Sequence, residues 1–148
     1  MSLDTNKAIV RRHFEELWTN GDSDVADEIY SPDAIGHCGS LPDQVGYPES
    51  EKQGVRDDRL AFPDGRATVL AQIAEGDMVL TRWRFEGTHR GPLYGAPASG
   101  SEVSVTGFHL HRLADGKIVE VWAQGDFYGL LVQVGALPAR SDAGAAVG

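Results

Sequence analysis

The sequence predicts an α+β domain in which helices come first and a curved antiparallel sheet wraps over them. Apolar residues recur at helical spacing near the start of the chain, whereas β-branched and alternating residues fill its second half. The length of 148 residues fits one domain with a sizeable core. We expect this domain to span residues 1–137 and a flexible tail, rich in Ala, Gly and Ser, to span residues 138–148.

Three helices are predicted in the first half of the chain. An amphipathic helix over about residues 4–20 ends at Gly21, which suits a C-terminal cap. A second helix begins near Ser23 and ends at Pro32, and a third spans about residues 49–62. A short strand over 34–37 and a loop over 39–48 separate the last two helices, and the loop is long enough to form a lid or a pocket rim.

The predicted sheet contains strands over about 67–74 and 78–87, followed by a hairpin. Asp115-Gly116 suits a two-residue type I′ turn, which pairs Ala114 with Lys117. Strict alternation from that turn places His111 opposite Glu120 and groups several side chains on one face. This face carries Val105, Gly107, His109, His111, Glu120, Trp122, Gln124 and Asp126.

The opposite face of the hairpin carries Phe108, Leu110, Arg112, Val119, Val121 and Ala123. Because both faces are substantially apolar, we expect both to be covered. The face with proton-exchanging groups predicts a pocket for a small hydrophobic ligand. The other face would be exposed in a monomer, so the pattern predicts a homodimer through the outer face of the sheet.

Composition excludes several classes of partner. The formal net charge of −9 argues against nucleic acid and anionic membrane surfaces as the main partners. A single cysteine, Cys38, excludes an intramolecular disulfide and fits a cytoplasmic protein. The sequence also contains no apolar run of the roughly 18 residues that a transmembrane helix needs, and its N-terminal residues do not form a signal peptide pattern.

Several motifs follow one another in a recognisable order. They are Ser31-Pro-Asp-Ala-Ile-Gly-His37, Ala61-Phe-Pro-Asp-Gly65, Glu75-Gly-Asp-Met-Val79, Gly87-Thr-His-Arg-Gly-Pro-Leu93, Leu113-Ala-Asp-Gly-Lys-Ile-Val-Glu-Val-Trp122, Asp126 and Leu130-Leu-Val-Gln-Val-Gly-Ala136. In this order and spacing, over about residues 6–137, the chain resembles the SnoaL-like polyketide cyclases of the nuclear-transport-factor-2-like superfamily. The resemblance implies a cone-shaped α+β barrel with a deep, mostly apolar pocket.

The resemblance also implies an activity. Cyclases of this family close a ring by an intramolecular aldol reaction on a polycyclic polyketide ester, without a metal or an organic cofactor. The position of their acid/base aspartate corresponds to Asp126 here. Such a reaction needs a base for a proton beside a carbonyl and an acid for the developing alkoxide. A helix N-cap is the alternative role for Asp126.

Other side chains are candidates for the same site. His109, His111 and His37 can polarise or orient substrate oxygens, because histidine titrates near neutrality. Structural alternatives are a cross-strand pair with Glu120 for His111, packing on Trp122 for His109 and a loop anchor for His37. Phe14, Trp18, Trp83 and Trp122 are expected to contact a flat ligand. A metal site made by His109 and His111 with Glu120 or His37 is the less favoured interpretation.

Two other functional classes stay open. A non-catalytic module would use the same pocket to hold an apolar ligand, or the sheet face to bind a partner. A water-activating hydrolase would need a second carboxylate or an arginine beside Asp126, and no motif in the sequence fixes one. Fold alone does not decide between these classes.

Overall fold

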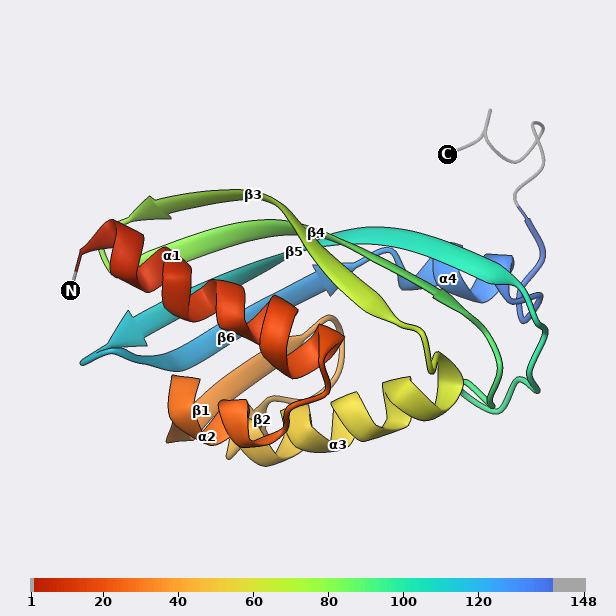
Figure 1. The fold of residues 1–148 in the computed structure, drawn as a ribbon, viewed down its shortest axis with the longest axis horizontal. Coiled ribbons are helices and arrows are strands. Elements are labelled where there is room, and N and C mark those ends of the chain that lie inside the picture. Colours follow the sequence, from red (N-terminus) through yellow and green to blue (C-terminus); the bar gives the residue numbers. More distant parts are fainter. Residues whose placement is uncertain (1, 140–148) are drawn as a thin grey trace.

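The computed structural model describes residues 2–139, with helices packed on one face of a six-stranded sheet (Figure 1). The strand order is β2-β1-β6-β5-β4-β3, and every neighbouring pair is antiparallel except the parallel pair β1 and β6. The α+β prediction is confirmed. Most of the predicted tail, residues 140–148, lies outside the described residues. The strands are β1 (Tyr30–Cys38), β2 (Gln44–Val45), β3 (Arg66–Glu75), β4 (Met78–Thr88), β5 (Glu102–Ala114) and β6 (Lys117–Gly125).

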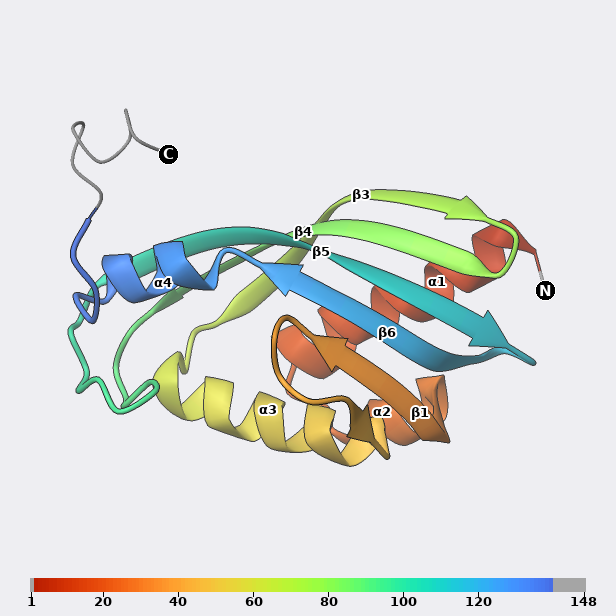
Figure 2. The ribbon, with the colours of Figure 1, turned by 180° about the vertical axis from the view of Figure 1, so that it is seen from behind.

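The helices are α1 (Leu3–Arg12), η1 (His13–Thr19), α2 (Asp24–Ile29), α3 (Tyr47–Ala61) and α4 (Phe127–Gln133). The predicted first helix is thus α1 continued by η1, a π-helix in which the Asn20 N–H reaches the Glu15 carbonyl at 3.3 Å. Seen from behind, the sheet turns its other face away from α1, α2 and α3 (Figure 2). None of the helices within residues 2–139 combines the length and the apolar character needed to cross a membrane.

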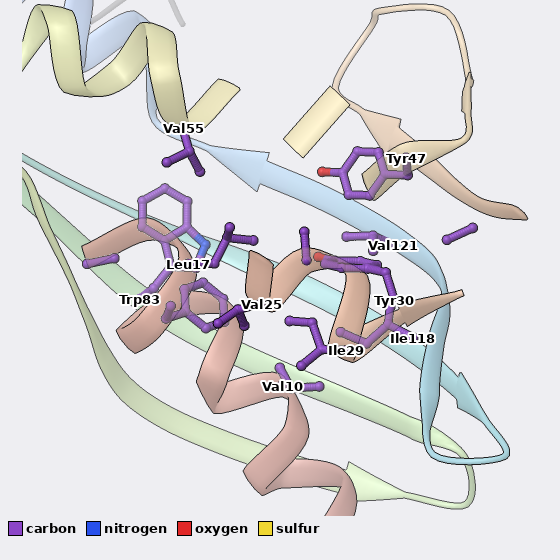
Figure 3. Close-up of a cluster of buried hydrophobic side chains, with 14 of the residues drawn as sticks. Val10, Leu17, Val25, Ile29, Tyr30, Tyr47, Val55, Trp83, Ile118 and Val121 are labelled. Atoms are coloured by element: carbon purple, nitrogen blue, oxygen red, sulfur yellow. The ribbon is translucent and has the colours of Figure 1, made fainter. Parts of the chain in front are cut away.

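The core lies between these helices and the concave face of the sheet. Its buried side chains come from every layer, and Figure 3 shows Leu17, Ile29 and Val55 of the helices gathered with Trp83, Ile118 and Val121 of the sheet. Each fully buried aliphatic side chain of this kind contributes about 1.5–3 kcal/mol. Apolar packing therefore holds α1, η1 and α3 against the strands that carry the candidate site.

The hairpin turn is as predicted, but the register beyond it is not. Asp115 and Gly116 have φ values of 51° and 76°, as a type I′ turn requires, and Ala114 pairs with Lys117. The next pairs are Leu113 with Ile118 and Arg112 with Glu120, so Val119 is an extra residue in a β-bulge. The prediction of strict alternation on β6 is therefore wrong.

The bulge exchanges the two faces of β6, because a shift of one residue turns every later side chain over. His109 and His111 keep the inner face, opposite Ala123 and Val121. Val121 and Ala123, predicted to lie outside, are buried at 0% and 8% exposure. The side chains that are moved to the outer face, beside Phe108, Leu110 and Arg112, are Glu120, Trp122 and Gln124.

Candidate functional site

Three histidines meet inside the cone, where η1 lies over β5. The ring centroid of His13 is 5.4 Å from that of His109 and 5.2 Å from that of His111, and the last two rings stack at 5.7 Å. We call these three residues the histidine centre. Phe14 packs edge-on against all three rings. His13 is only 1% exposed, so it belongs to the interior and not to the outer side of the first helix.

Hydrogen bonds fix two of the three imidazoles. The Trp83 indole N–H donates to His109 Nδ1 at 2.7 Å, so a neutral His109 carries its proton on Nε2. The Tyr30 hydroxyl lies 2.8 Å from His13 Nδ1. His111 is fully buried, and neither of its ring nitrogens has a partner among residues 2–139. Unpaired buried polar atoms are rare, and a ligand oxygen or a water can satisfy them.

Burial keeps the histidine centre uncharged. It lowers the pKa of His109 to about 4. Burial also lowers the pKa values of His13 and His111 well below the usual range, and the neighbouring histidines add to this effect. At neutral pH the centre consists of neutral imidazoles, which donate N–H groups without carrying a charge.

A buried carboxylate, Glu51, adjoins the histidine centre from α3. Its Oε2 accepts the Trp18 indole N–H at 2.7 Å and lies 3.4 Å from His13 Nδ1. Burial raises the pKa of Glu51, while hydrogen bonds from Tyr47 and Trp18 act in the opposite direction. In Figure 3 the hydroxyl groups of Tyr30 and Tyr47 point toward the same part of the interior. The sequence prediction missed Glu51, although helical spacing groups it with Tyr47 and Val55.

Two further carboxyl groups lie outside this cluster. Asp126 is exposed, and its Oδ1 accepts the Gly129 N–H at 2.8 Å as the N-cap of α4. Its predicted placement on one face with His109 and His111 is therefore wrong. Asp58 follows Glu51 by seven residues on α3, and burial raises its pKa to about 7. Seven residues are about two helical turns, so both carboxyl groups lie on one side of α3.

His37 and Trp122 lie on the outer face of the sheet, away from the histidine centre. The His37 ring stacks on Trp122 at 5.3 Å, and its two nitrogens lie 2.7 Å from Glu120 and Asp43. These two carboxylates raise the pKa of His37. The prediction that Trp122 contacts the pocket is wrong, because the β-bulge turns it outward. Of the predicted aromatic contacts, the structure brings Phe14, Trp18 and Trp83 to the interior cluster.

The sheet also separates the residues suggested for a metal site. Glu120 and His37 lie on the face opposite His109 and His111. Among residues 2–139, no three His, Cys, Asp or Glu side chains are arranged to hold a metal ion. Two surface hollows, of about 590 and 470 Å³, are lined by residues around Asp64 and Tyr94, and neither includes the histidine centre.

Comparison with known proteins assigns the family. The family model for SnoaL-like polyketide cyclases matches residues 8–134. This chain belongs to the SnoaL-like polyketide cyclase family. Over 138 residues it is 31% identical to aklanonic acid methyl ester cyclase DnrD of Streptomyces peucetius, which covers 90% of this chain and 92% of that protein. DauD of Streptomyces sp. (strain C5), also an aklanonic acid methyl ester cyclase, is 31% identical over 86% of this chain and 80% of its own.

Solved structures of the SnoaL-like family share the fold. AclR from Streptomyces galilaeus, a suggested hydroxylase, superposes with a TM-score of 0.84 at 26% identity over 99% of this chain and 90% of its own. A suggested SnoaL-like polyketide cyclase from Jannaschia sp. CCS1 gives a TM-score of 0.82 at 29% identity, over 91% of this chain and 94% of its own. The expected α+β barrel architecture is confirmed, while the different activities suggested for these neighbours leave the reaction to be argued from the site.

Proposed function

We propose that this SnoaL-like protein is an enzyme that closes or isomerises a hydrophobic carbonyl compound, without an organic cofactor, by chemistry of the aldol type. The observation that carries the proposal is the fully buried His111, whose ring nitrogens find no hydrogen-bond partner within residues 2–139, beside two other neutral histidines. Such imidazoles can donate N–H groups to a carbonyl oxygen inside an apolar site. The relatives named as aklanonic acid methyl ester cyclases support a polycyclic aromatic substrate.

The proposed reaction needs two proton transfers. A carboxylate takes a proton from the carbon beside a ketone, and the electron pair of the C–H bond becomes the enolate. The enolate carbon then bonds to a second carbonyl carbon, and the resulting alkoxide takes the proton back from the carboxylic acid. Histidine N–H groups stabilise the oxygen on which negative charge develops. Asp126 is the acid/base that the resemblance predicts, and its Asn variant tests this role while keeping the N-cap.

The outer face of the sheet supports a homodimer as part of the proposal. Phe108 is 48% exposed there, beside Leu110 and Trp122. A non-catalytic binding module remains the second candidate, and it would retain the ligand unchanged. Turnover of a bound ketone discriminates between the two.

Ligand binding in the interior is expected to quench Trp18 and Trp83 but not Trp122. We titrate the protein with 2-hydroxyanthraquinone and follow its tryptophan fluorescence. Trp122→Phe should keep most of the quenching that the wild type shows. The double variant Trp18→Phe/Trp83→Phe should lose most of the signal. Quenching that disappears only in Trp122→Phe would place the ligand on the outer face and contradict the interior site.

A further inference from the structure

Asp126 is held in place where β6 ends and α4 begins. Its backbone N–H donates to the Thr106 carbonyl at 3.1 Å, and its Oδ1 accepts the Gly129 N–H at 2.8 Å. Within residues 2–139 this is the one hydrogen bond that the carboxylate accepts. Because the residue is exposed, Oδ2 is left open to a ligand.

The backbone of Asp126 turns its carboxylate onto Gly129. For comparison, Ser2 is the N-cap of α1 with an extended ψ of 160°, and it accepts the N–H of Thr5, a residue with a side chain, at 3.0 Å. Asp126 makes the corresponding hydrogen bond with a ψ of 66°. A Cβ at position 129 would overlap Oδ2 and would lie 2.7 Å from Cγ and 2.9 Å from Oδ1. An N-cap thus tolerates a side chain three residues later, but this placement of the carboxylate does not.

Helix formation does not account for a glycine at position 129. Glycine is among the poorest helix formers, because it loses the most backbone freedom. Gly129 lies inside α4 and is not one of the glycines with a positive φ, so its backbone suits any residue. The feature that excludes a side chain here is the Asp126 carboxylate.

One aromatic ring connects the end of β6 with the histidine centre. Gly125 directly precedes Asp126, and a Cβ at Gly125 would lie 3.1 Å from Trp83 Cη2. The same indole donates its N–H to His109 Nδ1 at 2.7 Å. Trp83 therefore spans from the strand end that carries the carboxylate to the histidines that are proposed to hold the substrate oxygen.

We propose that Gly129 is a positioning residue for Asp126, the acid/base of the proposed function. Its N–H holds Oδ1, and the space left by its missing side chain holds Oδ2. Oδ2 takes the proton when the substrate C–H bond breaks, and the electron pair of that bond forms the enolate. After the new C–C bond has formed, Oδ2 returns the proton to the alkoxide. The inference rests on the proposed function and explains how its base is oriented.

The test uses 1-tetralone in D₂O and follows the loss of its α-proton signal by NMR at several ketone concentrations. This exchange reports proton abstraction alone, and its saturation gives kcat and KM. We expect the wild type to exceed the buffer rate and Asp126→Asn to fall at least about 100-fold toward it. Gly129→Ala should lower kcat by about 10- to 100-fold, because the methyl group displaces the carboxylate, and should leave KM within about twofold.

Thermal unfolding of the same variants separates positioning from a purely structural role. Gly129→Ala should melt within about 4 °C of the wild type, since the better helix propensity of alanine offsets a weakened cap. Gly54→Ala, the matched exchange in α3, should keep kcat within about twofold of the wild type.

Three outcomes would contradict the proposal. Full kcat in Gly129→Ala, with exchange lost in Asp126→Asn, would overturn this inference and leave the proposed function standing. A loss of kcat in Gly129→Ala that comes with a fall in melting temperature of more than about 4 °C would assign Gly129 a structural role instead. A wild type that binds the ketone without exceeding the buffer rate would overturn both the proposed function and this inference.

Discussion

Gly107→Ala should destabilise the protein by about 3 kcal/mol, because the added methyl group has no space on the inner face of β5. A Cβ at Gly107 would lie 2.3 Å from Trp83 Cζ2 and 2.5 Å from the backbone oxygen of Gln124. The strand pair β5–β6 and the Trp83 ring would both have to move. Since Trp83 donates to His109, the variant should also disturb the histidine centre. Urea unfolding followed by circular dichroism measures the change in free energy.

Gly54→Ala is the matched control for this prediction. Gly54 lies within α3, and its added Cβ would make an ordinary contact of 3.4 Å with Trp18. Alanine is better than glycine in a helix by about 1 kcal/mol, so this variant should be slightly more stable than the wild type. Equal stability of Gly107→Ala and the wild type would contradict the close packing of Trp83 on the sheet.

His111→Leu should gain stability relative to the wild type as the pH falls from 8 to 5. The pKa of His111 in the folded state lies well below its unfolded value of 6.5, because burial disfavours the charged ring. Below pH 6.5 the unfolded wild type therefore binds a proton that the folded state does not bind, and the wild type loses stability. Leucine removes this linkage, so the free energy of unfolding of His111→Leu relative to the wild type should rise by about 2 kcal/mol between pH 8 and pH 5.

Urea unfolding of both proteins at pH 8 and pH 5 gives this difference. Comparing the two proteins at each pH cancels the protons that Glu51, Asp58 and His37 take up elsewhere. A difference that does not depend on pH would mean that His111 titrates normally in the folded state. His37→Gln is the contrasting variant, because its partners raise the pKa of His37. As the pH falls from 8 into the pKa range of His37, this variant should lose stability relative to the wild type, the opposite of His111→Leu.

Local patterns were sufficient to place the three N-terminal helical segments, the hairpin turn and the α+β class, but not α4, and the second helix ends at Ile29, before the predicted Pro32. The register of β6 was not predictable from alternation, because no residue type marks Val119 as a bulge. A physical clue was nonetheless present: strict alternation would bury Glu120 and Gln124 beside two histidines, and the bulge avoids that cost by placing both outside. The same shift moved Trp122 from the predicted pocket to the outer face.

The histidine centre was only half predictable. His109 and His111 share a strand face by simple alternation, and the structure keeps them together. His13 and Glu51 come from η1 and α3, and only the tertiary packing of these helices brings them within 3.4 Å of each other. A glutamate on the buried side of a predicted helix was a readable signal, but its partners were far away in the sequence.

The central claim is that the three interior histidines are neutral and form the ligand site. Long-range ¹⁵N–¹H NMR of histidine-labelled protein tests it most directly, since ring nitrogen shifts report tautomer and charge. We predict that His13, His109 and His111 stay neutral from pH 8 to pH 5, whereas His37 titrates above its usual range. Bound 2-hydroxyanthraquinone should shift the signals of these three interior histidines and leave the His37 signal unchanged. Interior histidines that titrate near pH 6.5, or a bound ligand that shifts only His37, would contradict the central claim.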